Sequence, residues 1–318
     1  MTNGASSKPD VLAAVALGLV GAMFFSGTFV VNRAIGLAGG HWVWTATLRY
    51  AWALALMLPW FLVRGSLGQV LAEFGRHWRF WVVAGSVGYG VFYSGLAYAS
   101  TQAPGWIVAC TMQFTILATP LVLRAFGARV QRHGVALLAL TFLGIVLVNL
   151  DRRGDETVAQ LLGVLPVVLS AFAYPTGNQL VQEGRNGGRG WIPAITAPVT
   201  ADASARVLLL TLGSVPYWLV VLLVPHPALP TGQQVGGTLI IALSATVIGT
   251  TLFLRARQSV GRNPDAISKV DATQAGYTVF TLSGEVLLLG ALWPTLLGWT
   301  GLGLVLAGLV AYTVFSRH

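Results

Sequence analysis

The sequence predicts an all-α, polytopic membrane protein with ten transmembrane helices arranged as two inverted five-helix repeats. Hydrophobic residues make up 55% of the 318 residues and charged residues only 9%, and the mean hydropathy is +0.72. A soluble domain carries about 25% charge. The chain also contains a series of apolar runs of about 20 residues, the length that crosses a bilayer. A short acidic turn from Asp151 to Thr157 separates five of these runs from five more.

In chain order, the predicted helices are 11–33, 42–63, 79–100, 103–126, 132–150, 159–182, 205–224, 234–255, 267–290 and 295–315. No small-residue cleavage site stands out after the first run, so we expect that helix to be retained. Several links are very short, as at Thr101-Gln102 and from Ala291 to Pro294. Those neighbouring helices must be antiparallel.

The two halves, 1–150 and 151–318, resemble each other within one membrane domain. Each half begins with a helix that holds polar residues and ends in a glycine-rich helix. Because five is an odd number, the second half must enter the membrane upside down relative to the first. This inverted-repeat design is typical of secondary transporters, whose substrate site lies between the halves near the bilayer midplane.

The basic residues are distributed unevenly among the predicted loops. With the N-terminus inside, the outer side holds only Arg33, Arg152 and Arg153 of the 19 lysines and arginines, and nearly all others lie on the inner side. Positive charge concentrates on the cytoplasmic side of membrane proteins, so both termini are expected there. The net charge of +9 does not indicate nucleic-acid binding, because no dense basic block is present.

Two charged residues lie deep inside apolar runs. A charge at the centre of a membrane helix costs roughly 3 kcal/mol even on insertion scales, and such residues are functional candidates. Glu285 lies in the ninth helix and Arg49 in the second. Counting residues from each helix middle places both in the outer half of the membrane. We therefore expect Glu285 and Arg49 to be partners or to face one cavity. One interpretation is that Glu285 binds a proton during transport. The alternative is that Glu285 and Arg49 form a static ion pair that holds two helices together.

Other polar residues are candidates for the solute path. Gln113 in the fourth helix and Gln274 in the ninth are equivalent if the repeat holds, and both can donate and accept hydrogen bonds. Tyr89 and Tyr93 are four residues apart and share a helix face. Aromatic faces bind organic cations, although tyrosines in membrane helices often serve packing instead. Asn178 adds a polar group to the sixth helix.

Prolines inside two of the predicted helices are candidate hinges. Proline removes a backbone donor and kinks a helix. Pro120 lies in the fourth helix and Pro175 in the sixth, where a bend would assist alternating access. The alternative interpretation is an inert kink.

The sequence lacks the patterns of most enzymes. Neither of its two lysines, Lys8 and Lys269, follows a phosphate-binding loop. The five histidines are scattered and show no metal-ligand spacing, and the single Cys110 cannot form an internal disulfide. We therefore predict neither enzyme activity nor a cofactor or metal. Transport must draw on an ion or solute gradient.

Several motifs together resemble the drug/metabolite transporter superfamily in its ten-helix, EamA-like form, closest to the branch of multidrug resistance efflux transporters. They are Leu48-Arg49-Tyr50, Asn263-Pro264-Asp265-Ala266, Val270-Asp271-Ala272-Thr273-Gln274 and Gly284-Glu285. The resemblance extends from about Val11 to Phe315. Arg124 is a departure, since many EamA-like proteins carry an acidic residue near that place.

The resemblance implies export of a small organic solute across a bacterial plasma (inner) membrane. A drug-like cation exchanged for protons is one candidate, favoured by Glu285 and the aromatic residues. An amino acid or other zwitterionic metabolite is the rival, because Arg49 can hold a carboxylate. A membrane scaffold or lipid-handling protein without solute transport is the alternative from another class. The expected partners are the solute, the lipid bilayer and protons, and the oligomeric state is left open.

Overall fold

The computed structural model describes residues 11–127, 135–151, 157–224, 227–260 and 264–315. These residues are almost entirely helical, and no β-strand occurs among them apart from one isolated bridge between Arg189 and Ile192. The all-α prediction is therefore confirmed. The division into halves 1–150 and 151–318 stays a prediction.

The helices before residue 151 are α1 (Val11–Leu37), α2 (Trp42–Val63), α3 (Leu67–Arg76), α4 (Trp78–Gly85), the π-helix η1 (Ser86–Val91), α5 (Phe92–Gln102), α6 (Gly105–Met112), α7 (Thr115–Ala125) and α8 (Val135–Leu150). Those after it are α9 (Thr157–Arg185), the 3₁₀-helix η3 (Pro198–Ala201), α10 (Ala203–Leu223), α11 (Gly232–Ile241), the π-helix η4 (Ala242–Gly249), α12 (Thr250–Ser259), α13 (Pro264–Ala272), the 3₁₀-helix η5 (Thr273–Ala275), α14 (Gly276–Leu289) and α15 (Leu296–Phe315).

Among the described residues, six helical stretches are long and apolar enough to cross a membrane: Val11–Leu37, Trp42–Val63, Trp78–Gln102, Gly105–Ala125, Ala203–Leu223 and Gly232–Ser259. Shorter apolar helices cover Ala139–Leu150 and Leu296–Ala311. A polytopic membrane protein is the fold that these stretches support. Helix also occupies the remaining predicted ranges, through α9 and through α13 to α14. That all ten cross the membrane stays a prediction.

Four of the predicted helices are interrupted rather than regular. The third and eighth contain the π-segments η1 and η4, and the fourth and ninth break near Gln113 and Gln274. A π-segment widens one turn of a helix and is common at functional sites. The apolar pattern could not reveal these interruptions, because hydropathy is the same in either helix type. The short helix α3 was not predicted either, since it is too polar for a span.

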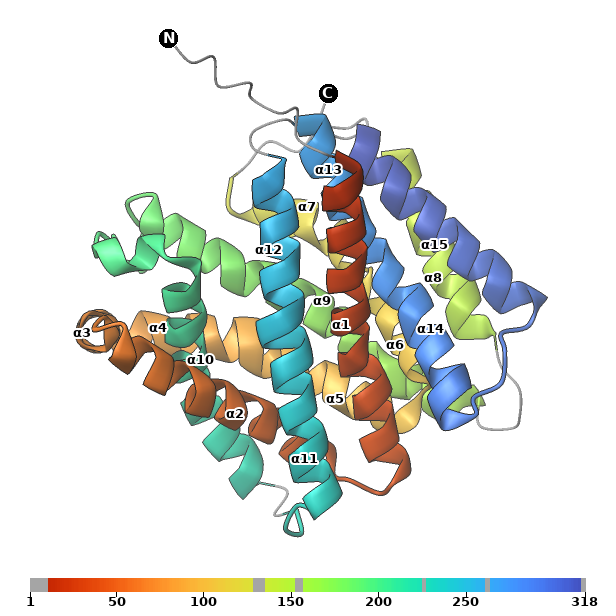
Figure 1. Cartoon of the computed structure of the whole chain (residues 1–318), viewed down its shortest axis with the longest axis horizontal. Coiled ribbons are helices and arrows are strands. Elements are labelled where there is room, and N and C mark those ends of the chain that lie inside the picture. Colours follow the sequence, from red (N-terminus) through yellow and green to blue (C-terminus); the bar gives the residue numbers. More distant parts are fainter. Residues whose placement is uncertain (1–10, 128–134, 152–156, 225–226, 261–263, 316–318) are drawn as a thin grey trace.

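Packing between the two halves is reciprocal. Helix α1 packs against α12 and α14 from the second half, and α9 packs against α5 and α7 from the first. The last helices of the two halves, α8 and α15, lie side by side at one edge of the molecule (Figure 1). Helix α10 packs against α4 and α2 at the opposite edge. The start of α1 and the end of α15 lie at the same end of the molecule (Figure 1).

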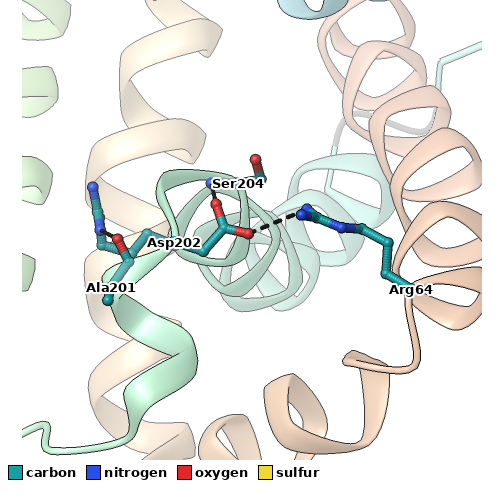
Figure 2. Close-up of polar contacts among 5 residues, drawn as sticks. Arg64, Ala201, Asp202 and Ser204 are labelled. Carbon is teal, nitrogen blue, oxygen red and sulfur yellow. Dashed lines mark hydrogen bonds and ion pairs between the residues drawn. The ribbon is translucent and has the colours of Figure 1, made fainter. Parts of the chain in front are cut away.

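An exposed ion pair joins α2 to α10 (Figure 2). Arg64, which ends α2, lies 3.5 Å from Asp202 through its Nη1 and the carboxylate Oδ2. The other oxygen of Asp202 accepts a hydrogen bond from the Ser204 N–H at 2.9 Å, which caps the start of α10. An exposed pair of this kind contributes little to stability, so substitutions of Arg64 or Asp202 are suitable controls for substitutions of buried charges.

One close contact between the halves is made by two glycines. Gly88 in η1 faces Gly177 in α9, and a Cβ atom on Gly177 would lie 2.3 Å from the Gly88 Cα. Small residues let helix backbones approach in lipid, where van der Waals packing drives association. No side chain can be added at this crossing without moving one helix.

We predict that Gly177→Ala lowers the stability of the purified protein by about 1–3 kcal/mol, the usual cost of overpacking. Thermal unfolding in detergent measures this change. Gly236→Ala is the matched control, because a Cβ there meets nothing within 4 Å and alanine favours the helix by about 1 kcal/mol. Equal melting temperatures for the two variants would contradict the tight crossing.

Candidate functional site

The carboxylate of Glu285 holds the start of α6. Glu285 lies in α14 and is 1% exposed. Its Oε1 accepts a hydrogen bond from the Gly105 N–H at 2.6 Å, and its Oε2 accepts one from the Trp106 N–H at 3.0 Å. The first N–H groups of a helix have no acceptor within the helix, and the helix dipole makes this end positive. A deep carboxylate is thus paired with backbone rather than with a cationic side chain.

The local sequence explains why α6 begins here. Ala103 is extended and Pro104 carries no N–H, so a new helix starts after α5 ends at Gln102. A Cβ on Gly105 would lie 2.8 Å from the Phe29 carbonyl oxygen and 2.9 Å from Glu285 Oε1. Only glycine lets α6, α1 and the carboxylate approach so closely. The Pro104-Gly105 pair was the sequence signal for this contact, and sequence analysis missed it.

Glu285 also lines a cavity of about 350 Å³ near the ends of α1, α8 and α14. Arg33 and Asp151 line the same cavity. The Arg33 guanidinium donates to the carbonyl oxygens of Ser100 and Thr101, each at 3.3 Å. Asp151 accepts from both the N–H and the hydroxyl of Thr295, which anchors the start of α15. The cavity therefore gives Glu285 a polar approach from this end of the molecule.

Arg49 does not pair with Glu285, so the expected ion pair is wrong, whereas the alternative of a shared cavity stays a prediction. The Arg49 Nη1 lies 3.5 Å from the Thr28 hydroxyl, and the guanidinium carbon lies 4.2 Å from the centre of the Tyr93 ring. Gly105, which binds Glu285, packs against Phe29. The two charges thus lie at one level of α1, as residue counting predicted, but they have different partners. Glu285 binds the backbone N–H groups at the start of α6 instead of the arginine. A sequence pattern of side chains could not indicate a backbone partner.

Arg49 lies in a cluster of aromatic side chains. The Tyr50 ring is 5.4 Å from Tyr89, 5.8 Å from Tyr93 and 5.1 Å from Trp218, centre to centre. The structure therefore brings the predicted Tyr89 and Tyr93 together. Tyr93 is fully buried, and its hydroxyl exchanges hydrogen bonds with the Asn32 amide at 3.1 and 3.2 Å. Tyr50, Asn32 and Trp218 were absent from the predicted site, although Tyr50 directly follows Arg49.

Gln113 and Gln274 both lie at interruptions of their helices. Gln113 is 5% exposed and ends α6, and its Nε2 donates to the Thr278 hydroxyl at 3.3 Å. Gln274 belongs to η5, one helical turn before Thr278. Its side-chain nitrogen is buried without a hydrogen-bond partner among the described residues. The two glutamines therefore contact or lie close to the same stretch of chain.

A second cavity, of about 360 Å³, lies between α7 and α9. Asn178 and Pro175 line it from α9, and Thr115 and Thr119 line it from α7. Helix α9 continues through Pro175 without a break, and Pro120 is buried inside α7. These prolines remain candidate hinges. The lining of this cavity mixes apolar side chains with uncharged polar ones, whereas the cavity beside Glu285 also has charged residues in its lining.

We predict that Glu285→Ala destabilises the protein more than Glu285→Gln. Alanine leaves the buried N–H groups of Gly105 and Trp106 unpaired, at about 1–3 kcal/mol for each, whereas glutamine keeps one carbonyl acceptor. Thermal unfolding in detergent ranks the variants. Glu183→Ala is the control, because the Glu183 carboxylate accepts only from Gln179 among side chains of the described chain. A Glu285→Ala protein as stable as the wild type would refute the contact.

Comparison with known proteins assigns the chain to a family. Residues 12–318 match the family model "EmrE: Putative multidrug resistance efflux transporter". "Uncharacterized protein YjlA" of Bacillus subtilis is 33% identical over 96% of both chains. A second relative, from Shouchella clausii, is named "Uncharacterized 42.1 kDa protein in intracellular alkaline protease 3'region". It is 31% identical over 84% of this chain and 70% of its own.

A solved crystal structure superposes with a TM-score of 0.59 over 96% of this chain and 98% of its own. Its sequence identity of 17% makes this a likeness of fold alone. The family match spans nearly the whole chain and is one of transporters rather than enzymes. The chain therefore belongs to the EmrE family of multidrug resistance efflux transporters within the drug/metabolite transporter superfamily, and it is a membrane transporter of small solutes.

Proposed function

We propose that this transporter exports a small organic solute in exchange for protons. The observation that carries the proposal is the Glu285 carboxylate, which is buried against the start of α6 and borders a cavity. Of the described acidic residues, Glu285 is the one inside an apolar helix at such depth. Buried carboxylates in membrane helices are typical proton-relay groups.

The chemistry of the contact suggests how a proton acts. An ionised carboxylate accepts two charge-assisted hydrogen bonds and is attracted to the positive end of α6. Protonation removes the charge and leaves an O–H donor beside two N–H donors, so the bond to α6 weakens. Because Glu285 joins α14 to α6, protonation loosens two helices at once. The proton thereby favours a second arrangement of the halves, which is what coupled transport requires.

We further propose that the protein crosses a bacterial plasma membrane ten times, in two inverted halves, and that both termini lie on the cytoplasmic side. Three kinds of correspondence support the repeat: π-segments at η1 and η4, interruptions at Gln113 and Gln274, and the reciprocal packing of α1 and α9. Gln113 and Gln274 are then equivalent residues. The charge asymmetry of the loops supports the orientation.

The two cavities lie at different depths along the α6–α7 pair. The first borders Glu285 at the start of α6, on the outer side in the proposed orientation, and the second lies along α7. We propose that Asn178 and Gln113 line the solute path from the inner side, and that Pro120 and Pro175 allow α7 and α9 to bend. Alternating access then opens one cavity as the other closes.

We predict that Glu285→Gln removes the response of solute flux to a pH gradient. In proteoliposomes screened with cationic dyes and amino acids, the wild type should accelerate flux when protons can move in the opposite direction. The glutamine variant should retain gradient-independent solute exchange, because its amide cannot be ionised. Asp202→Asn is the matched control, since it neutralises an exposed carboxylate on α10's cap.

A wild-type pH response in the Glu285→Gln variant would refute the proton role while leaving transport intact. If the folded wild type moves no solute, the chain is instead a scaffold or lipid-handling protein. Lipid scrambling in the same vesicles separates those two outcomes.

A further inference from the structure

Arg49 is a deep cation for which the described chain supplies no anion. Each carboxylate whose side chain the structure describes is engaged elsewhere: Glu73 with His77, Asp151 with Thr295, Glu183 with Gln179, Asp202 with Arg64, Asp271 with Arg257 and Glu285 with Gly105. The guanidinium contacts the Thr28 hydroxyl at 3.5 Å, and it interacts with Tyr93 both over the ring face and through a side-chain hydrogen bond. Neither of these carries a negative charge.

An arginine in this state is incompletely satisfied. Its guanidinium presents five N–H donors in a planar fork that matches a carboxylate. The Thr28 hydroxyl accepts one weak hydrogen bond at 3.5 Å, and the Tyr93 ring offers a cation–π contact. Charged groups within a membrane pair with one another or mark a solute pathway. Since the described residues provide no such pair for Arg49, we assign this arginine to a solute pathway.

The surroundings of Arg49 suit an apolar body attached to the anion. Tyr50 stacks on Trp218 with an interplanar angle of 23°, and Tyr89 leans against Tyr50 at 32°. The Asn32 amide fixes the Tyr93 ring on which Arg49 rests. Aromatic faces provide apolar contact area that is held in place before a ligand arrives.

Glu285 is a poor site for the complementary charge. Both of its carboxylate oxygens already accept backbone hydrogen bonds from α6, and Arg33 lines the cavity beside it, so an organic cation would meet an engaged carboxylate and a neighbouring positive charge. Arg49 has no such competitor. The electrostatics of the deep site therefore favour a solute with a negative group over one that is only positive.

We propose that the transported solute carries a carboxylate that binds Arg49, with its apolar part against Tyr50, Tyr89 and Trp218. This inference rests on the proposed transport function and names the substrate class of the same molecule. Both simple organic acids and zwitterions meet the description. A purely cationic drug does not.

Four probes with one phenylpropyl body test the charge requirement: 3-phenylpropanoate, L-phenylalanine, 3-phenylpropanamide and 3-phenylpropylamine. Their affinities for the detergent-purified protein are measured from ligand-induced shifts in melting temperature. We expect the two carboxylates to stabilise the wild type, and the amide and amine to bind at least 10-fold more weakly. Stabilisation by the amine alone, or by none of the four, would overturn the proposal.

Variants of Arg49, and of Arg64 at the end of α2, test where the carboxylate binds. Arg49→Gln should weaken carboxylate binding at least 10-fold, and Arg49→Lys should do so by a smaller factor, because lysine keeps the charge without the fork. Arg64→Gln, which removes the exposed arginine at the end of the same helix, should bind as the wild type does. Unchanged carboxylate binding by Arg49→Gln would overturn the assignment.

The apo melting temperatures separate a binding role from a structural one. If Arg49 awaits an anion, both substitutions should leave the ligand-free protein at least as stable as the wild type. A large loss of stability in both variants would identify Arg49 as a structural cation and overturn the proposal. Proton-driven flux decides the proposed function separately, because the binding measurements need no vesicles and no gradient.

Discussion

The bond between Glu285 and the first N–H groups of α6 is the contact on which the rest of the account depends. Inside an apolar bundle, the start of a helix and an isolated carboxylate are each costly. Placed together, they satisfy each other. The N–H groups of Gly105 and Trp106 have no acceptor within α6, and they donate to the two oxygens of Glu285, which forms no salt bridge within the described chain. Gly105 makes this possible because a larger residue would collide with Phe29 of α1. Three helices meet at this one point.

The contact also separates two charges that would otherwise attract each other. Glu285 and Arg49 lie at the same level of α1, yet each carboxylate oxygen accepts a backbone hydrogen bond while the guanidinium lies over an aromatic ring. Under the proposed mechanism, Glu285 is then able to take up a proton and Arg49 to accept an anion. A direct salt bridge would have removed both capacities, since each charge would then neutralise the other.

Much of the helical outline could be predicted from the sequence. The ends of the ten apolar runs fall within four residues of the observed helix ends, apart from the predicted start at 132, which lies outside the described residues. Hydropathy and short polar links determine where an apolar helix begins and ends. The similar level of Glu285 and Arg49 along α1 also followed from a rise of 1.5 Å per residue. The shared face of Tyr89 and Tyr93 followed from their four-residue spacing.

What sequence reasoning missed depends on contacts between segments far apart in the chain. The partner of Glu285 is a backbone group 180 residues earlier, and backbone donors leave no trace in composition. The contacts of Asn32 and Tyr50 with Tyr93, and of Trp218 with Tyr50, likewise require four helices to be placed in space. The π-segments η1 and η4 escaped notice because they preserve the apolar pattern of the helices around them.

Hydrogen–deuterium exchange at the start of α6 tests the central claim most directly. The peptide that contains Gly105 and Trp106 is compared between the wild type and Glu285→Gln at one fixed pD, with a peptide from α8 as the internal reference. The account predicts faster exchange at Gly105 and Trp106 in the variant, because a neutral side chain holds these amides less tightly, and no change in α8. Identical protection of α6 in the two proteins would contradict it.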